Sequence, residues 1–432
     1  MSNSQPSTFS PQLPKGFKQT EVGVIPEDWD VKPLGHLIKL QAGYSFRSEN
    51  FSDIGIPVIR ISDIQDGIVN VDSAICHPPF KIDDDFVVKN GDFLVAMSGA
   101  TTGKVGIFHS PKTAYQNQRV GRFVVRDETR TSQPFVGQLV RSSRFGSRLS
   151  ILLEQGAQPN VSGRQIESLL FPVPSQLPEQ RAIATALSDV DGLLGGLDRL
   201  IAKKRGLKAA AMQQLLTGHT RLPDFCGEWQ VKRLGELAKI QRGASPRPID
   251  SPVWFNDNSS IGWVRISDVT RSGMFLYETT QRLSPLGVQH SRPVPTGSLI
   301  MSICATVGRP IITKIDVCIH DGFVVFDNLQ ADQRFLYYML KWVEPDWSKH
   351  GQTGSQMNLN TGLITGTPIS LPPIPEQTAI AEVLTDMDAE LAALEQRREK
   401  TRALKQAMMQ ELLTGRTRLV ARAGADHAEV KT

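Results

Sequence analysis

Several short segments carry residue types that could hold a nucleotide or a target base. Residues 99–105 read GATTGKV, a glycine-rich run with a lysine, which is typical of loops that cradle nucleotide phosphates. Such a loop needs four residues between its glycines, and this segment has three. Val105 also stands where a serine or threonine would hold Mg²⁺. Since the later run ATVGR at 305–309 has no such lysine, the pattern favours a turn at a strand end.

A second segment, His77-Pro78-Pro79-Phe80, is similar to the Asx-Pro-Pro-aromatic signature of amino-methyltransferases. The first side chain of that signature accepts from the amino group of the base, and a neutral histidine accepts through only one ring nitrogen. No glycine-rich loop for a methyl donor precedes it, so we expect a turn. Pro223-Asp224 has the residues of a nuclease start, but no Glu/Asp-x-Lys triad follows at usable spacing. A self-contained methyltransferase or nuclease is therefore the least favoured function.

The cysteines and histidines form no metal-binding pattern. The four cysteines include no CxxC pair, and no His/Cys cluster has the spacing of zinc ligands. This usage is typical of a reducing compartment. We therefore expect no catalytic residue, cofactor site or metal site in this chain, and a cytoplasmic location.

Basic residues are the remaining side chains that could bind a partner. A net charge of +4 and a pI of 8.8 permit an anionic partner without requiring one. One arginine series is opposed only by Asp127 and Glu128 within its span. Such a surface could neutralise phosphates, and it could equally be a solvated face. The series comprises Arg119, Arg122, Arg126, Arg130, Arg141, Arg144 and Arg148.

The elements that must position these groups occur twice. Residues 29–43 and 229–243 are identical at nine of fifteen positions. Residues 178–222 align without a gap on 375–419, with 25 identities in 45. An offset of about 200 residues is far longer than the roughly 20–50 residues of a solenoid repeat. The pattern predicts a duplicated unit in the order domain, helix, domain, helix, with a pseudo-two-fold axis.

Two proline-free segments, 179–216 and 376–413, are predicted to be long helices. Apolar residues recur in both at alternating spacings of four and three, which is typical of a coiled-coil seam. Because a whole domain separates the two helices, the second can return antiparallel to the first. The predicted seam residues are Ile183, Leu187, Val190, Leu194, Leu197, Ile201, Ile380, Leu384, Met387, Leu391 and Leu394.

The predicted fold class is α+β, with two mixed α/β domains separated by the two long helices. Short β-rich runs alternate with Gly, Pro, Asn and Asp, and 40% of the 432 residues are hydrophobic, so each domain can bury a core. No apolar run approaches the roughly 20 residues of a membrane span, and residues 1–14 lack the apolar region of a signal peptide. The predicted boundaries are 1–25 (a segment whose first part is flexible), 26–177, 178–222, 223–374, 375–419 and 420–432 (a flexible tail).

These segments resemble the specificity (S) subunits of type I restriction–modification enzymes. KQTEVGVIPEDW at 18–29 is similar to the opening of that family. The helix starts LPEQ and IPEQ and the helix ends LLTGHTRL and LLTGRTRL are similar to it as well. The resemblance extends from about Lys18 to Leu419, and the ordered duplicate of its motifs makes it specific.

The resemblance implies that each β-rich domain is a target recognition domain for one half of a split site in double-stranded DNA. It implies that the coiled coil sets the gap between the half-sites and that the chain is not itself catalytic. Two modification subunits, with S-adenosylmethionine, and two restriction subunits, with ATP and Mg²⁺, are the implied partners; no membrane is involved. Since the domains differ while the helices agree, we expect an asymmetric target.

Candidate DNA-contacting residues come from two kinds of position. Polar residues that recur in both copies are more typical of the scaffold or of phosphate contacts, and we interpret Arg60 and Arg265 as ion pairs with the Ser-Asp that follows each. Base readers are expected where the copies diverge, such as 116–122 and 242–251, because Gln and Asn suit adenine and Arg suits guanine. The candidates are Arg60, Thr101, Lys104, Asn117, Arg119, Arg122, Gln158, Asn160, Arg242, Arg247, Arg265, Thr306, Arg309, Gln356 and Asn358.

Two other functions stay open. A specificity subunit of a related methylation-based system would have the same fold with other partners. A coiled-coil scaffold carrying two protein-binding domains, without a DNA role, is compatible with the weak net charge.

Overall fold

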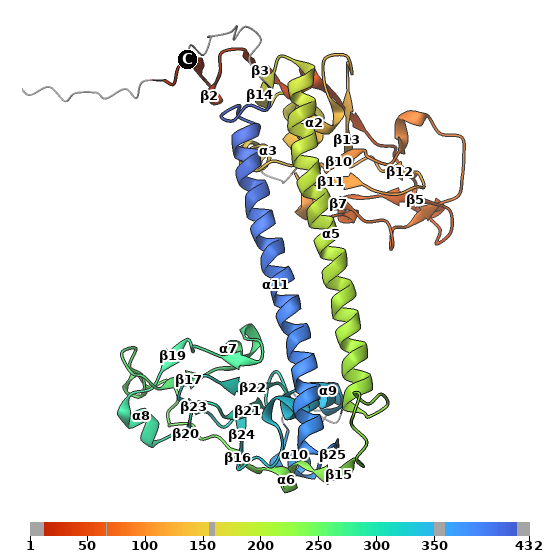
Figure 1. Cartoon of the computed structure of the whole chain (residues 1–432). Coiled ribbons are helices and arrows are strands. Elements are labelled where there is room, and N and C mark those ends of the chain that lie inside the picture. Colours follow the sequence, from red (N-terminus) through yellow and green to blue (C-terminus); the bar gives the residue numbers. More distant parts are fainter. Residues whose placement is uncertain (1–12, 66, 155–159, 350–358, 421–432) are drawn as a thin grey trace, which may run out of the picture. The chain divides into compact units, whose positions relative to one another are not determined.

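The computed structural model describes residues 13–65, 67–154, 160–349 and 359–420. The ends of the chain that were expected to be flexible lie largely outside these residues. The chain forms two compact units. The first unit holds the residues up to Gly196 together with those from Arg398 onward, and the second unit holds Leu197–Arg397. Each unit therefore contains one β-rich domain, the beginning of one long helix and the end of the other (Figure 1).

The described residues of the first unit form fourteen strands and four short α-helices that precede its long helix. Its strands are β1 (Phe17–Thr20), β2 (Gly23–Pro26), β3 (Trp29–Pro33), β4 (Ile38–Ala42), β5 (Ile56–Ile59), β6 (Ile64–Gln65), β7 (Ile68–Val69), β8 (Cys76–His77), β9 (Val87–Val88), β10 (Phe93–Ala96), β11 (Val105–Phe108), β12 (Ala114–Gln116), β13 (Val120–Val125) and β14 (Leu170–Pro174). Its short helices are α1 (Leu34–Leu37), α2 (Gln133–Val140), α3 (Ser143–Glu154) and α4 (Gly163–Glu167).

The second unit repeats this plan with fewer strands. Its strands are β15 (Gln230–Arg233), β16 (Lys239–Arg242), β17 (Gly262–Val264), β18 (Phe275–Leu276), β19 (Gln281–Arg282), β20 (Arg292–Val294), β21 (Leu299–Ser302), β22 (Pro310–Thr313), β23 (Val317–Ile319), β24 (Phe323–Asp327) and β25 (Pro368–Leu371). Its short helices are α6 (Leu234–Leu237), α7 (Ile266–Arg271), α8 (Pro285–Gln289), α9 (Gln333–Lys349) and α10 (Thr361–Gly366).

The sheets of the two units have matching strand orders. The larger sheets run β4-β13-β10-β11-β7-β6 and β16-β24-β21-β22-β18, and the four-stranded sheets run β8-β5-β12-β9 and β19-β17-β23-β20. Even the parallel pairs correspond, since β12 is parallel to β5 and β23 is parallel to β17. The internal repeat and the mixed α/β character predicted from the sequence are therefore confirmed.

The long helices are α5 (Leu177–Leu216) and α11 (Ile374–Leu412), within one or two residues of the predicted limits. Gly218 and Gly415 follow them with φ of +71°, a conformation that side chains other than glycine rarely adopt. A Cβ atom at Gly415 would lie 2.5 Å from Cγ of Pro26, so glycine is also required there for space.

The two helices pair antiparallel within each unit. In the first unit Lys405 Nζ of α11 lies 2.6 Å from Asp191 Oδ1 of α5. In the second unit Lys204 Nζ of α5 lies 2.6 Å from Glu390 Oε1 of α11, and Lys208 forms an ion pair with Asp388. All the predicted seam residues are buried or half-buried. However, Ile183 and Leu187 belong to the core of the first domain, so the seam at that end is shared with the domain.

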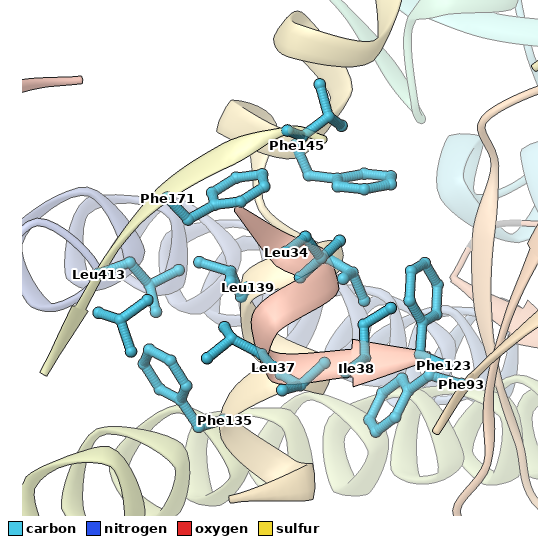
Figure 2. Packing of buried hydrophobic residues seen from close by; sticks show 14 of the residues in the cluster. Leu34, Leu37, Ile38, Phe93, Phe123, Phe135, Leu139, Phe145, Phe171 and Leu413 are labelled. Atoms are coloured by element: carbon cyan, nitrogen blue, oxygen red, sulfur yellow. The ribbon is translucent and has the colours of Figure 1, made fainter. Parts of the chain in front are cut away.

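The buried core of each unit includes the end of a helix that began in the other unit. In the first unit Leu413 joins a cluster with Leu139, Phe135 and Phe171 (Figure 2). In the second unit Leu215 and Leu216 occupy the equivalent place. Each domain therefore folds around both helices, which explains why the helix ends are the most similar part of the two copies.

Each long helix is held at its start by a buried Glu-Gln pair. The Gln180 amide oxygen accepts from the backbone N–H of Ser132 at 3.0 Å, and Gln377 accepts from that of Asp332 at 2.8 Å. The preceding glutamates, Glu179 and Glu376, are each 1% exposed and bind an arginine of the other helix end. These contacts explain why the Pro-Glu-Gln motif occurs at both helix starts. Its Glu and Gln side chains join the domain and both helices at one point.

Among the described residues, no helix is both long and apolar enough to cross a membrane.

Candidate nucleic-acid interface

In the first unit, the ends of three strands meet at one edge of the sheets. The backbone N–H of Asn117, after β12, donates to the carbonyl of Ile59 in β5 at 3.1 Å. The N–H of Met97, after β10, donates to the carbonyl of Arg119 at 3.0 Å. Thr101 Oγ1 donates to the carbonyl of Ile61 at 3.0 Å. The topology therefore brings together loops that are up to 60 residues apart in sequence.

Most of the predicted candidates of the first domain lie on these loops. Lys104 and Arg119 are exposed, and Arg60, Thr101 and Asn117 are half-buried. Asn160 is exposed and forms a bridge with Ser98 at the same edge. Gln158 lies outside the described residues.

Arg60 has only a weak link to the Ser-Asp that follows it. Its backbone N–H donates to Asp63 Oδ2 at 2.8 Å, but its Nε lies 3.9 Å from that oxygen. The carboxylate therefore caps the short turn after β5 and leaves most of the guanidinium donors available. An arginine held in this way can donate to a base edge or a phosphate.

Arg122 does not belong to this surface. It is 8% exposed, and its guanidinium donates to the carbonyls of Val87 and Asp85 and to Asp92 at 2.7, 2.9 and 3.1 Å. The side chain fixes the loop between β8 and β10 from inside the domain. The prediction that Arg122 contacts DNA is therefore wrong, because its guanidinium is buried and bound inside the domain.

An aromatic cluster adjoins the same edge. Tyr44, which forms a bridge with Asn117, lies 5.0 Å from Phe46 and 5.8 Å from Phe80 between ring centroids. Phe46 also stacks on Tyr115 at 5.7 Å. Tyr44 and Phe80 are 39% and 37% exposed, so the cluster presents an apolar face. The clustering of Tyr44, Phe46 and Phe51 in the sequence was the signal that could have identified this face.

In the second unit the equivalent edge carries a group of cations around one carboxylate. Arg242, at the end of β16, donates from Nε to the carbonyl of Asp321 at 2.6 Å. Arg247 Nη2 lies 3.2 Å from Asp321 Oδ2, and Ser245 Oγ donates to Oδ1 at 2.6 Å. The Ser245 hydrogen bond, together with Arg247, lowers the pKa of Asp321. Arg242 and Arg247 are both exposed, as expected of residues that contact a partner.

Arg265 does not form the predicted side-chain ion pair with Asp268. Asp268 accepts from the backbone N–H of Arg265 at 2.9 Å, but its side chain is bound by Arg271 and Thr280. The Nε of Arg265 instead donates to Gln281 Oε1 of β19 at 2.6 Å. The ion-pair interpretation is therefore wrong for Arg265. Gln281, which the sequence did not single out, orients this guanidinium.

His320 lies beneath the same edge in the neutral state. Burial lowers its pKa to about 4, although Asp321 acts in the opposite direction. Its Nδ1 accepts from the backbone N–H of Gly322 at 2.9 Å, and its ring lies 4.8 Å from Phe323 and 5.8 Å from Trp263. The histidine is therefore part of the packing that shapes the loop between β23 and β24.

The turn after β21 carries the other candidates of the second domain. Thr306 and Arg309 are half-buried, and their carbonyls accept hydrogen bonds from Ser302. Gln356 and Asn358 lie outside the described residues. No group of three or more His, Cys, Asp or Glu side chains that could hold a metal ion occurs in the described part of the chain.

The arrangement in both units suits the binding of a polar, anionic surface by loops. Arginines at strand ends are oriented by neighbouring residues, and the opposing carboxylate of Asp321 is itself hydrogen-bonded. Such groups supply phosphate contacts and bidentate contacts to guanine.

Comparison with known proteins gives this architecture its family. The chain belongs to the family of the type I restriction modification DNA specificity domain, whose model matches residues 26–200 and again residues 227–403.

Two curated relatives show the extent of the likeness. A protein of Methanocaldococcus jannaschii named as the specificity subunit of the type I restriction enzyme MjaX is 24% identical over 424 residues, covering 94% of this chain and 97% of that protein. The EcoKI specificity subunit of Escherichia coli is 26% identical over 251 residues, covering 54% and 53% of the two chains.

Solved structures share the fold. The type I restriction-modification S subunit from M. genitalium superimposes with a TM-score of 0.59 at 16% identity, covering 89% of this chain and 96% of that one. A chain from a structural study of complex assembly in the type I R-M system gives 0.58 at 19% identity, covering 91% and 99%. The resemblance seen in the sequence is thus confirmed. The chain is of the class of specificity subunits, which recognise DNA and are not catalytic.

Proposed function

We propose that this chain reads a split, asymmetric sequence in double-stranded DNA, with one half-site for each unit. The domains at 26–177 and 223–374 would be the two target recognition domains. The proposal is supported by the equivalent loops of the two units, which follow sheets of the same strand order but carry different side chains. Arg60, Asn117 and Arg119 lie on the first edge, and Arg242 and Arg265 lie on the second.

The single observation that carries the proposal is the fixed orientation of Arg265 in the second unit. The half-buried Arg265 is oriented by the neutral side chain of Gln281. Its remaining donors therefore have a fixed direction, and Gln281 does not neutralise the positive charge of the guanidinium. In the first unit the equivalent Arg60 has a different setting, with its Nε 3.9 Å from Asp63 Oδ2 and its backbone N–H donating to the same oxygen. Two scaffold-equivalent arginines in different settings would read different bases.

The antiparallel helices would act as the ruler between the half-sites. In a rigid helix pair, an insertion of one turn moves the attached domain by about 5.4 Å, which corresponds to roughly one to two base pairs at 3.4 Å per step. Two readers on one face of the duplex should have centres about one helical turn, or 10–10.5 base pairs, apart.

The helices also present a surface for partner subunits. Leu207 and Leu404 occupy equivalent positions in the two copies and are 48% and 56% exposed. Lys203 and Lys400 lie one turn before them, and both are exposed. We propose that each leucine docks one modification subunit, which would bring S-adenosylmethionine. Restriction subunits would bring ATP and Mg²⁺, and the complex would act in the cytoplasm.

The test is to co-express the chain with a methyltransferase encoded beside its gene and to sequence the host DNA for modified adenine. A split motif with a fixed gap that requires this chain is the expected result. If a soluble complex assembles and no new methylation arises, the proposal is wrong. The scaffold role would then account for the exposed leucines, since it needs partner binding without DNA.

A further inference from the structure

A pocket of about 320 Å³ lies between the first domain and α11, and nothing in the proposed base-reading role uses it. Its wall combines the turn before β7, the turn after β10, the junction of α2 and α3, and one side chain from α11. The described residues that line it include Gly103, Arg141, Ser142, Gly146 and Lys405. All of them belong to the first unit.

The helix after β13 is broken at the pocket. In the first unit, α2 ends at Val140 and α3 begins at Ser143, so that Arg141 and Ser142 turn toward the cavity. In the second unit, α9 runs without a break through the equivalent position. In both units an apolar side chain covers the glycine of the equivalent turn, since an added Cβ would lie 2.7 Å from Leu149 Cδ2 at Gly103 and 2.7 Å from Trp347 Cε3 at Gly308.

The charged residues among those lining the pocket are both cations. Arg141 and Lys405 have side chains that are 20% and 12% exposed. Both bind the same carboxylate, Asp191, at 3.1 and 2.6 Å, and Gln138 also donates to it at 3.2 Å. Two cations on one carboxylate leave a net positive charge on a partly desolvated wall, which favours a bound anion.

Local pKa values agree with this charge balance. Burial lowers the pKa of Lys405, the hydrogen bond to Asp191 raises it, and the positive charge of Arg141 lowers it again. The first turn of α3 lies at the same wall and adds a partial positive charge.

We propose that this pocket holds one phosphate group of the DNA backbone, an inference that rests on the proposed DNA-reading function. Gly103 belongs both to the pocket wall and to the turn of Thr101 and Lys104 in the candidate interface. A duplex lying on that turn brings its backbone next to the pocket. The contact carries no sequence information, and it fixes the register of the first domain on the duplex.

Gly146 offers a test that leaves the ion network intact. It lines the pocket, and a Cβ built there meets no atom within 4 Å, so a side chain can be added without a clash. Gly146→Glu places a carboxylate at the pocket, and Gly146→Gln is its neutral control. Gly192→Glu adds the same charge on α5 of the same unit, where a Cβ is also unobstructed.

The measurement is the affinity of the assembled methyltransferase complex for duplex DNA as a function of salt. The slope of log K against log salt should be smaller by about 1 in Gly146→Glu, for target and random duplexes alike. Gly146→Gln and Gly192→Glu should keep the wild-type slope. An unchanged slope in Gly146→Glu would overturn the phosphate contact while leaving the reader function in place.

Inorganic phosphate distinguishes the source of the anion. It should compete with DNA at the wild-type pocket and compete less in Gly146→Glu. If the variant loses phosphate binding but keeps the DNA slope, the pocket takes free phosphate and the backbone contact is refuted. If the wild-type complex fails to bind any duplex, the proposed function itself fails.

Discussion

Arg418, just beyond the end of α11, binds Glu179 at the start of α5, although 239 residues separate them. Arg418 Nη2 donates to Glu179 Oε2 at 2.8 Å and also lies 2.9 Å from Asp28 Oδ2. The same relationship recurs in the second unit, where Arg221 binds Glu376 at 2.5 and 2.6 Å. In each unit, the end of one long helix is thus fixed to the start of the other by a bidentate ion pair.

Arg418→Met should destabilise the first unit by roughly 3 kcal/mol, because the buried carboxylate of Glu179 loses its ion-pair partner and keeps the Trp29 Nε1 hydrogen bond at 3.2 Å. Urea unfolding of the full chain measures this change. Arg416→Met is the matched control, since Arg416 is 64% exposed and lies 3.9 Å from Glu411, and it should change stability by less than about 0.5 kcal/mol. Equal effects of the two substitutions would show that the buried pair has no special weight.

His320 should make the second unit sensitive to acid. Its pKa in the folded chain is lowered to about 4 by burial, below the ordinary 6.5. Between these values the unfolded chain binds more protons than the folded one, so stability falls as the pH falls through this window. The loss at pH 4 amounts to about 3 kcal/mol.

His320→Gln removes this titration and keeps an acceptor for the N–H of Gly322. The free energy of unfolding should therefore depend less on pH between 6.5 and 4 in the variant than in the wild type. Carboxylates titrate in both proteins, so the difference between the two curves isolates the histidine. Parallel curves would mean that His320 binds its proton equally well in the folded and the unfolded chain, so that folding does not lower its pKa.

The sequence predicted the helices well because they rest on local apolar periodicity, and it predicted the repeat well because the two copies share many identical residues. Apolar spacing set the limits of α5 and α11 to within one or two residues. It could not show that Ile183 and Leu187 face the first domain, because a seam and a domain-facing stripe have the same period.

The candidate site was less predictable, since it depends on which loops the sheets bring together. Arg122 and Arg119 are three residues apart, yet one fixes a loop from inside and the other is exposed. Arg119 lies in the turn before β13, whereas Arg122 lies within the strand, and the spacing of the two arginines does not show where the strand begins. Gln281 was missed because its partner Arg265 follows β17, and only the pairing of β17 with β19 brings the two residues together.

Leu404→Asp and Leu207→Asp should abolish binding of the methyltransferase subunit without unfolding the chain. Both leucines are about half exposed, so the folded chain loses little when either is replaced. Gel filtration of co-expressed subunits reports assembly, and urea unfolding reports stability. Normal assembly of both variants would remove these leucines from the partner surface.

Substitutions in the buried seam should destabilise the chain itself, in contrast to those of the exposed leucines. Leu391 is 9% exposed, so Leu391→Asp places a charge in an apolar contact and should destabilise the second unit by several kcal/mol. Leu194→Asp should act in the same way in the first unit. Assembly would then fail because the helix pair is lost. A stable, assembling Leu391→Asp chain would contradict the coiled-coil account.

Arg265→Ala should relax recognition at one position of one half-site and leave the other half-site unchanged. A bidentate contact to guanine contributes about 1–3 kcal/mol of discrimination. Sequencing of methylated DNA from cells that carry the variant reads the motif directly. Arg60→Ala is the matched substitution in the first domain, and any relaxation that it causes must fall in the opposite half-site.

Gln281→Ala separates positioning from contact. It removes the acceptor that orients Arg265 but keeps the guanidinium, so the same position should relax by a smaller amount. Arg265→Lys should not restore recognition, because an ammonium cannot form the two parallel hydrogen bonds. If Gln281→Ala relaxes a different position from Arg265→Ala, Gln281 touches a base itself and is not merely the support of its neighbour.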